Sequence, residues 1–216
     1  MCNEYYTVSK PSESLYIVKK SKFISNVVPV NGAKEAEDHL EKFRKKYWDA
    51  THNVYAYSIG LNSEIQKFSD DGEPSGTAGV PILEVIKKED LRNVVIVVTR
   101  YFGGIKLGTG GLIRAYTKGA KIALDAGIII KKKLHKIFEL EIAYTLLGKV
   151  ENELNQHGYT IKEIIYDELV HIFIYVPIDE GERFIKHITQ WTNARFKIAE
   201  KDTQYLTIKK SNQSFD

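Results

Sequence analysis

A run of apolar, β-branched residues, NVVIVVTRYF (93–102), is the feature that most constrains the fold of this chain. Its length and its valine and isoleucine content are typical of a buried central strand. The run leads into the glycine-rich GGIKLGTGG and then into LIRAYTKGAKIALDAG, whose apolar spacing predicts a helix that ends at Gly127. A buried strand, a glycine-rich connection and a helix therefore form the predicted centre of an N-terminal domain, which we expect to span residues 1–133.

Short strands and helices precede this centre. We expect two extended pieces within 14–30, a helix over 33–47, and a hairpin that joins THNVYAYSIGL to EIQKFS. VPILEVIKKEDL has the spacing of a further short helix. A strand, GIIIKKK, follows the long helix and closes the domain.

The second half of the chain shows the clearest architecture. Between 134 and 210, the apolar patterns follow the order strand, helix, strand, strand, helix, strand, with Asp179 as the expected cap of the second helix. This order is the split-βαβ, ferredoxin-like arrangement. The sequence therefore predicts a two-domain α+β protein whose last residues, 211–216, form a frayed tail.

Composition narrows the class of protein. A length of 216 residues with 43% hydrophobic and 27% charged residues is that of a globular protein of about two domains. The only cysteine, Cys2, has no internal disulfide partner, which favours a reducing compartment. The first residues lack the apolar core of a signal peptide, and the longest apolar runs are far short of a membrane span. We expect a cytoplasmic protein without a membrane partner.

Positive charge is concentrated in one part of the chain. The segment 91–138 contains ten Lys or Arg residues and one acid, Asp125, for a net charge of +9. Since the whole chain has a net charge of +3, the remainder carries −6. This asymmetry favours a surface that meets anions, most often nucleic acid or phosphate. The alternative is a set of scattered, solvated lysines.

The glycine-rich connection is a candidate anion-binding site. Backbone N–H groups of such a loop, together with the N-terminus of the following helix, can bind an anion, and Thr109 is placed to cap that helix. Arg114, Lys118 and Lys121 follow at i, i+4 and i+7, a basic stripe on the helix. The predicted site for nucleic acid or another anion comprises Arg100, Gly103, Gly104, Lys106, Gly108, Gly110, Arg114, Lys118 and Lys121.

Aromatic residues lie among these charges. Tyr101, Phe102 and Tyr116 supply the mixture of rings and cations that single-stranded nucleic acid uses for stacking and phosphate contact. In the alternative interpretation the aromatic rings belong to the core and the basic stripe is a solvated helix face. In either interpretation we expect Tyr116 to pack inward. The connection matches neither a phosphate-binding Walker loop nor the dinucleotide fingerprint.

The stretch SDDGEPSGTAG (69–79) combines three carboxylates with three glycines. It is consistent with a structural turn in which Asp70 caps neighbouring amides and Asp71-Gly72 supplies a positive φ, with a contact to a polar ligand, or with a magnesium or acid-catalysis site. His52 could act as a general base or as a hydrogen-bonded structural residue. The predicted pocket rim comprises His52, Asp70, Asp71, Glu73 and Thr77.

No pattern in the sequence identifies an enzyme. No serine or cysteine lies in a nucleophile motif, and the histidines form no metal-spaced pair. We therefore expect no catalytic residues, no bound metal and no cofactor.

Three segments within about 49–120 together resemble the signature of the IMPACT/YigZ family. They are DATHNVYAY, SDDGEPSGTAGVPILEV and VVIVVTRYFGGIKLGTGGLIRAY. The resemblance implies a fold of the ribosomal-protein-S5-domain-2 type up to about residue 133. It also implies a ferredoxin-like domain similar to one of elongation factor G in the C-terminal half. The eukaryotic relatives act in translational control under amino-acid starvation, by competing for the activator of an initiation-factor kinase. They carry an additional N-terminal protein-interaction domain that these 216 residues do not contain, and no catalytic residues carry over.

Three functions follow as hypotheses. The first is a non-enzymatic nucleic-acid-binding or ribosome-associated factor in translation regulation, with RNA, the ribosome or a protein of translation control as partner. The second is an enzyme that acts on a phosphorylated or nucleotide-like small molecule, with magnesium at Asp70, Asp71 or Glu73. The third is a protein-interaction regulator that uses the same groove.

Overall fold

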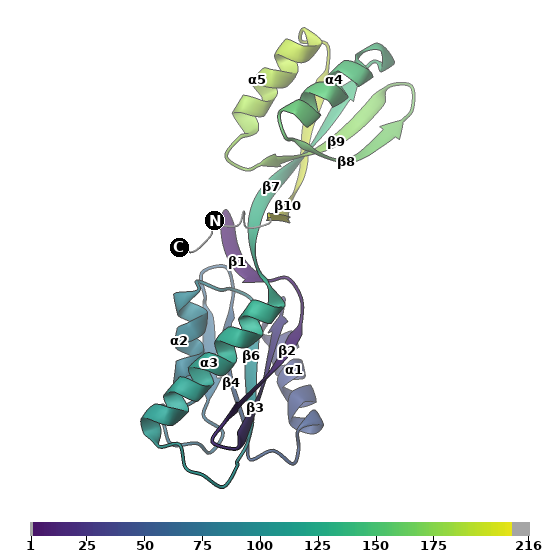
Figure 1. Ribbon diagram of the computed structural model, residues 1–216. Helices are drawn as coiled ribbons and strands as arrows, with labels where there is room; N and C mark the ends of the chain where they lie inside the picture. The colour runs from purple at the N-terminus through teal and green to yellow at the C-terminus, as the bar shows by residue number, and fades with distance from the viewer. Residues whose placement is uncertain (1, 209–216) are drawn as a thin grey trace. The chain divides into compact units, whose positions relative to one another are not determined.

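The computed structural model describes residues 2–208, which form two compact units, one mainly of residues 4–131 and one of 132–207 (Figure 1). Both units mix helices and strands, so the protein is a two-unit α+β protein, as predicted. The expected tail, 211–216, lies outside the described residues. Within the described part of the chain, no helix combines the length and apolar character that a membrane crossing requires.

The N-terminal unit is built on one antiparallel sheet with the predicted central strand in its middle. Its spatial order is β2-β3-β6-β4-β5. The side chains of Val94 to Val98 on the central strand are at most 1% exposed, which confirms a buried strand. The five strands are β2 (Ser12–Val18), β3 (Ser21–Pro29), β4 (His52–Ile59), β5 (Ile65–Ser69) and β6 (Val94–Tyr101).

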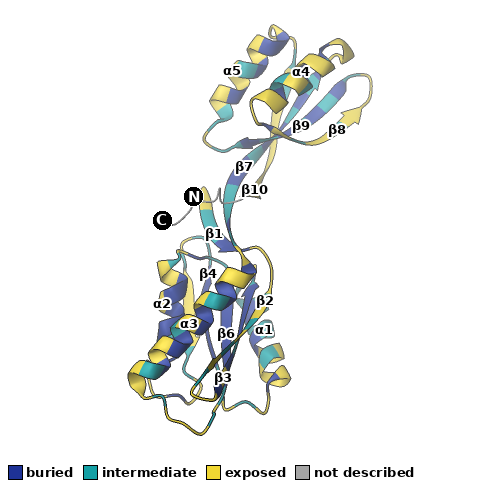
Figure 2. Ribbon diagram, in the orientation of Figure 1, coloured by how far each residue is buried: buried dark blue, intermediate teal, exposed yellow. Residues whose placement is uncertain are grey.

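Helices cover both faces of this sheet. The amphipathic helices α2 (Gly79–Lys88) and α3 (Thr109–Gly127) share one apolar core with the sheet, while α1 (Ala33–Lys46) forms a smaller core on the opposite face. Figure 2 shows the buried strands between these helices. Tyr116 on α3 is fully buried, which confirms the prediction that it packs inward.

Two predicted ends of α3 are wrong. Thr109 is the first helical residue and Gly108 is the N-cap, without a side-chain cap bond, so Thr109 does not cap the helix. At the other end Gly127 still belongs to the helix, and Ile128 takes the left-handed backbone conformation with φ 60°. A Cβ atom on Gly127 would lie 2.9 Å from Cγ1 of Val27, so the glycine serves close packing against β3.

A strand that the sequence did not predict lies near the N-terminus. β1 (Glu4–Val8) forms a parallel bridge between Tyr6 and Leu91, and the N–H of Arg92 donates to the Tyr6 carbonyl at 2.8 Å. Val8 is 1% exposed and joins the larger core of the unit.

The C-terminal unit has the predicted order of elements. Its four strands lie in the order β8-β9-β7-β10, and its two helices share one apolar core with the sheet. Two segments that were expected as separate strands, GIIIKKK (127–133) and KIFELEIAY (136–144), contribute to one continuous strand, β7. Its elements are β7 (Ile129–Ile142), α4 (Tyr144–Gln156), β8 (Thr160–Tyr166), β9 (Val170–Pro177), α5 (Gly181–Thr192) and β10 (Lys197–Ile208).

The predicted cap of α5 is also wrong. The N-cap of α5 is Glu180, and it makes no side-chain cap bond. Asp179 lies one residue earlier, and its carboxylate pairs with Nζ of Lys133 at 3.3 Å. The strand-to-helix connection therefore places the carboxylate beside a lysine of β7 instead of at the helix amides.

Candidate functional site: a basic surface around the β6–α3 connection

Asp70 organises the acidic stretch between β5 and α2. Its carboxylate accepts hydrogen bonds from the N–H groups of Gly76 at 2.8 Å, Ala78 at 3.1 Å and Gly79 at 2.8 Å. These amides belong to the turn that enters α2, where a carboxylate is stabilised by unpaired N–H groups and by the helix dipole. The structure thus confirms the interpretation of Asp70 as a residue that caps neighbouring amides.

Asp71 and His52 tie the same stretch to β4. The Asp71 carboxylate accepts the N–H of Asn53, and Nδ1 of His52 lies 2.7 Å from the Asp71 carbonyl oxygen, to which it can donate. Nε2 of His52 lies 3.8 Å from Oε2 of Glu73. Asp71 and Gly72 both have positive φ, 44° and 86°, as predicted for the turn.

Glu73 is the centre of a buried polar network. Its Oε1 accepts hydrogen bonds from NH1 of Arg100 at 2.6 Å and from Oη of Tyr116 at 2.7 Å. Burial and the negative charge of Glu73 both raise the pKa of Tyr116 far above its ordinary value, so its hydroxyl stays protonated and donates. The network joins the acidic stretch, the central strand and α3.

These hydrogen bonds occupy the carboxylates of the proposed magnesium site. Asp70, Asp71 and Glu73 each bind protein donors, and Asp70 uses both of its oxygens. A divalent cation needs several such oxygens at once. The three carboxylates therefore act in holding the loop.

A hollow of about 390 Å³ lies directly over the Arg100–Glu73 pair. Arg100 is 5% exposed, and its Nε is buried with no hydrogen-bond partner among the described residues. The guanidinium carbon lies 5.5 Å from the ring centroid of Phe23 and 5.4 Å from that of Phe102. The lining comprises Glu73, Pro74, Arg100, Phe102, Lys106, Leu107, Gly108, Thr109 and Leu112.

The glycine-rich connection forms one side of this hollow. A Cβ atom on Gly103 would lie 2.1 Å from the backbone carbon of Lys20, so only glycine fits against the turn between β2 and β3. The N–H of Gly103 donates to Oγ of Ser21 at 3.1 Å. Within residues 2–208, the amides of 109–111 have no acceptor, as is usual in the first turn of a helix, so α3 presents N–H donors here.

Two further hollows adjoin the first. One, of about 370 Å³, shares Phe102 with it and is lined by Lys20, Lys22, Ile24, Tyr101 and Phe102. The other, of about 270 Å³, shares Leu107 and is lined by Tyr16, Val18, Lys19, Leu107, Gly111, Arg114, Ala115 and Lys118. We call the residues that line the three hollows the basic surface.

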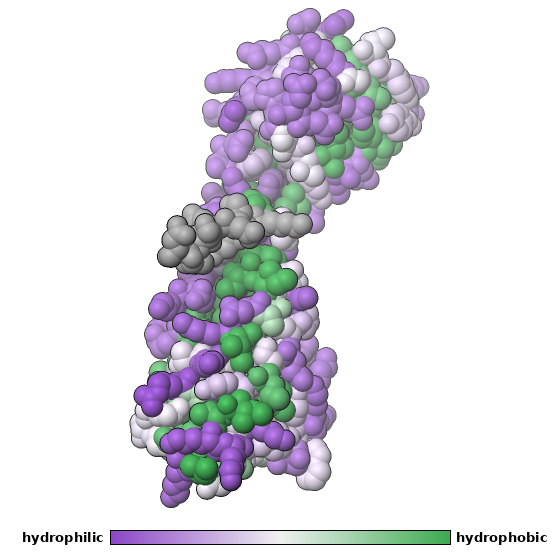
Figure 3. All heavy atoms as spheres, in the orientation of Figure 1, coloured by the Kyte–Doolittle hydropathy of each residue, from purple (hydrophilic) through white to green (hydrophobic). Residues whose placement is uncertain are grey.

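The basic surface has an unbalanced charge. It contains one carboxylate, Glu73, which the buried Arg100 already neutralises. Its other cations form no ion pair with any residue in 2–208: Lys19, Lys20, Lys22, Lys106, Arg114 and Lys118. Nζ of Lys118 lies 4.8 Å from the ring centroid of Tyr16. Figure 3 shows hydrophobic residues among hydrophilic ones on the face of the N-terminal unit that carries α3.

Comparison with known proteins identifies the family of this chain. Residues 19–124 match the Impact N-terminal domain, and residues 140–195 match a domain of unknown function, DUF1949. The chain is 46% identical over 206 residues to IMPACT family member YvyE of Bacillus subtilis, with 95% of both chains covered. The chain belongs to the IMPACT family.

Other IMPACT proteins match over different lengths. IMPACT family member YigZ of Escherichia coli is 32% identical and covers 84% of this chain and 90% of its own. Protein IMPACT of Danio rerio is 40% identical over 95 residues, which cover 42% of this chain and 29% of that protein. A crystal structure described as that of a hypothetical protein matches with a TM-score of 0.59 and 28% identity, covering 94% of this chain and 99% of its own.

The IMPACT match contains all seven cations of the basic surface, since they fall between Lys19 and Lys118. Of the predicted anion-binding residues, the structure brings Arg100, Lys106, Gly108, Arg114 and Lys118 into the three adjoining hollows. Gly104 and Gly110 lie exposed in the same connection and at the start of α3. Gly103 lies beneath it against the hairpin turn.

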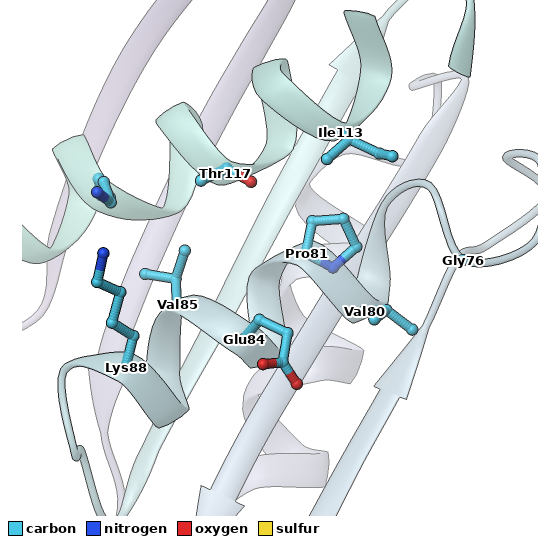
Figure 4. Close-up of a pocket in the computed structure, with 9 residues that line it drawn as sticks. Gly76, Val80, Pro81, Glu84, Val85, Lys88, Ile113 and Thr117 are labelled. Atoms are coloured by element: carbon cyan, nitrogen blue, oxygen red, sulfur yellow. The ribbon is translucent and has the colours of Figure 1, made fainter. Parts of the chain in front are cut away.

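Lys121 lies elsewhere. It lines a groove of about 380 Å³ between α2 and α3, together with Lys88 and the apolar side chains of Val80, Val85 and Ile113 (Figure 4). Positions 114, 118 and 121 lie within about 60° of one another around an α-helix, so the packing of α2 and of the β2–β3 hairpin along α3, not the helix period, separates Lys121 from the other two. The predicted single stripe therefore divides between two hollows.

Of the residues predicted to form the pocket rim, only Glu73 lines the hollow over the central strand, and the others hold the loop. Glu73 lines the hollow from below and is 8% exposed. Thr77 is 3% exposed, and its Oγ1 donates to the Pro74 carbonyl at 2.6 Å, so it stabilises the turn. Asp70, Asp71 and His52 likewise hold the loop in place.

Sequence reasoning missed the contribution of the β2–β3 hairpin. Lys19, Lys20 and Lys22 join the basic surface from a turn about 80 residues before the glycine-rich connection. Both Lys19 and Lys20 have positive φ, 44° and 64°, and are exposed. The run KKSK was the available signal, since a cluster of like charges at a turn indicates a surface for an oppositely charged partner.

Proposed function

We propose that this IMPACT protein is a non-enzymatic nucleic-acid-binding factor of the cytoplasm, associated with the ribosome or with translation control. The basic surface would bind the phosphate backbone through Lys19, Lys20, Lys22, Lys106, Arg114 and Lys118. The N–H groups of the first turn of α3 would add neutral donors.

The charge of the basic surface is the observation that supports this function. Six exposed cations that form no ion pair within the described residues surround one connection, and the only carboxylate among them is buried against Arg100. Cations that stabilise a fold are usually paired or scattered, whereas a one-sign surface attracts a polyanion over a distance. Exposed rings beside them, such as Phe102 at 46% exposure, are typical of sites for single-stranded nucleic acid.

The fold is compatible with this assignment. The strand order β10-β7-β9-β8 supports our assignment of the C-terminal unit to the ferredoxin-like arrangement, and we assign the N-terminal unit to the ribosomal-protein-S5-domain-2 type. Both arrangements recur in translation factors. Fold alone does not establish function, so the ligand has to be tested at the basic surface.

A titration with labelled RNA and DNA, single-stranded and duplex, at two salt concentrations tests the proposal. The Arg114→Ala/Lys118→Ala variant should bind more weakly, and its salt slope should fall by roughly 1.4 for a single strand, about 0.7 for each lost phosphate contact. Lys88→Ala/Lys121→Ala is the matched control, because it also removes two positive charges but from the α2–α3 groove. It should retain most of the affinity.

Two results would refute the proposal. One is the absence of binding to any nucleic acid at low salt. The other is an equal loss of affinity in both double variants, since this would show that only the net charge matters. In either case a protein-interaction function, for which the apolar α2–α3 groove is the candidate surface, would become the leading hypothesis.

A further inference from the structure

We infer that the basic surface takes single-stranded nucleic acid, whose unpaired bases stack on Phe102 and Trp48 and lie over the end of the sheet beside them. This inference rests on the proposed function and specifies its ligand. It concerns aromatic and apolar side chains that phosphate binding alone would not require.

The two rings are unusually accessible. Trp48 is 81% exposed and Phe102 is 46% exposed. Large aromatic side chains bury much apolar surface when they are covered, and exposed ones are often found in binding sites. Trp48 follows α1, and Phe102 follows β6, so the sequence separates them by more than fifty residues.

Hydrogen bonds hold the segments that carry these rings together. The N–H of Thr51 donates to the Arg100 carbonyl at 3.0 Å, and the N–H of Phe102 donates to Oγ1 of Thr51 at 3.0 Å. Oη of Tyr101 donates to Oδ1 of Asp49 at 2.8 Å. The turn after α1 and the end of β6 therefore form one support for both rings.

The carboxylate of Asp49 belongs to this support. It accepts the Tyr101 hydroxyl, and this bond raises the pKa of Tyr101 above its ordinary value. The tyrosine ring is thus neutral and fixed. A base that stacks nearby would meet a fixed, uncharged ring beside the lysines of the hairpin.

The sheet adds a row of side chains beside the rings. In the antiparallel register Ile17 pairs with Lys22, and Lys22 pairs with Tyr101, so the three side chains project from the same face. Ile17 is 55% exposed. An apolar side chain, a cation and a ring in one row can hold a base and its phosphate together.

Phe102 connects this row with the remaining cations. It lines both the hollow of Lys20 and Lys22 and the hollow of Lys106. Arg100 lies 5.4 Å from the centroid of its ring, a cation–π contact that fixes the ring from the protein side. Cations thus flank an already ordered ring, which suits a strand whose backbone passes on both sides of it.

Only unpaired bases can use this arrangement. In a duplex each base face is covered by its neighbours, whereas a single strand can place its bases on protein rings. Loss of one stacking contact weakens binding of a single strand by roughly tenfold. The proposed ligand is therefore a single-stranded segment of RNA or DNA.

Tryptophan fluorescence tests the inference in the full-length protein. Trp48 and Trp191 are the only tryptophans, and Trp191 is 7% exposed in the C-terminal unit. A single-stranded 12-mer should quench the fluorescence, and the same sequence as a duplex should bind more weakly without quenching. In Trp48→Phe, whose ring can still stack, binding should persist and the quenching should disappear.

Two further probes separate stacking from phosphate binding. A sugar–phosphate 12-mer without bases should bind roughly tenfold more weakly than the single strand, without quenching. Phe102→Ala should weaken the single strand to a similar degree and leave the base-free polymer unaffected. Phe68→Ala, which removes a ring of 44% exposure from β5, is the matched control and should bind as wild type does.

The outcomes are distinguishable. Equal affinity for the single strand and the base-free polymer, without quenching, would overturn the stacking inference while phosphate binding stands. Tighter binding of the duplex than of the single strand would do the same. No binding of any polymer would refute both the inference and the proposed function.

Discussion

Glu73 and Arg100 form a 2.6 Å ion pair although 27 residues separate them in the sequence, and their side chains are only 3% and 6% exposed. The pair joins the acidic stretch after β5 to the end of the central strand. It also forms the floor of the hollow that begins the basic surface. The acidic stretch therefore supports the candidate site, and the exposed cations of the basic surface have no acidic partner among residues 2–208.

Loss of the Glu73 charge should destabilise the protein strongly. In Glu73→Gln, the Arg100 guanidinium stays buried without its counter-charge, which costs about 3–5 kcal/mol of the free energy of unfolding. Tyr116→Phe removes one hydrogen bond to the same oxygen and should cost about 1.5–3 kcal/mol. Urea denaturation at pH 7 measures both values. A loss in Glu73→Gln no larger than that in Tyr116→Phe would contradict the central place of this ion pair.

Gly76 should tolerate far fewer substitutions than Asp71. Gly76 has φ 74°, and its N–H donates to Asp70, so Gly76→Val places a β-branched residue in a left-handed conformation and should lower the melting temperature. Asp71 has φ 44°, a conformation that asparagine adopts well, and Asp71→Asn keeps an oxygen that can accept from Asn53. Asp71→Asn should melt within a degree or two of wild type.

Gly76→Asn is the control for this pair. Asparagine tolerates the left-handed region, so this variant should be more stable than Gly76→Val. No atom of the described residues lies within 4 Å of a Cβ atom at this position, so crowding within that part of the chain does not contribute. Equal, large losses in Gly76→Val and Asp71→Asn would instead show that the Asp71 charge is essential to the loop.

Magnesium and manganese should have little effect on stability. The carboxylates of Asp70, Asp71 and Glu73 already accept bonds from backbone amides, Arg100 and Tyr116. A metal that bound only the native state would stabilise it by RT ln(1 + [metal]/Kd), so the melting temperature would rise with the metal concentration. Thermal melts with and without each metal, and with EDTA, check this expectation. A rise of several degrees at micromolar metal would revive the enzymatic alternative.

The C-terminal unit should lose stability as the pH falls through 6.5. Desolvation lowers the pKa of His187 below its ordinary value of 6.5, and the positive charges of His157 and Arg183 lower it further, against the opposing effect of Glu153 and Glu180. The unfolded chain therefore binds the proton more readily than the folded one. Protonation favours unfolding, and stability declines between pH 6.5 and the lower folded value.

His187→Gln should remove part of this decline. In a Trp48→Phe background, fluorescence of Trp191, whose ring stacks on His187 at 5.2 Å, follows the unfolding of this unit. Glu139 and Asp179 have lowered pKa values, so their contributions are lost only below their ordinary values of 4.5 and 3.8. An unchanged pH dependence between 7 and 5 in His187→Gln would show that another group is responsible.

Much of the fold could be predicted from local patterns. The strand over 93–102, the hairpin of β4 and β5, and the order of elements from β7 to β10 all follow from apolar periodicity and turn residues. The capping role of Asp70 was one of the interpretations that the sequence left open, and the inward packing of Tyr116 was predicted. The ends of α3 and α5 were not, because several residues near a helix terminus can serve as its cap.

The basic surface depends on contacts that no local pattern contains. The sequence predicted that Arg100, Lys106, Arg114 and Lys118 share one site, because they lie on or near one connection and one helix face. Packing of the β2–β3 hairpin beside β6 added Lys19, Lys20 and Lys22. Packing of α2 along the other flank of α3 placed Lys121 in a separate groove.

The sequence by itself determined the types and order of the elements, the concentration of positive charge and the glycine-rich connection, because periodicity and composition are local properties. Only the tertiary structure decided that Glu73 neutralises Arg100 and that Trp48 and Phe102 lie on one support. Glu73 and Arg100 are 27 positions apart in the sequence, and Trp48 and Phe102 are 54 positions apart. The geometry of both pairs depends on which strands pair and on which helix covers each face of the sheet. The free energy of this packing comes from contacts throughout the unit, so no local segment of the sequence determines it.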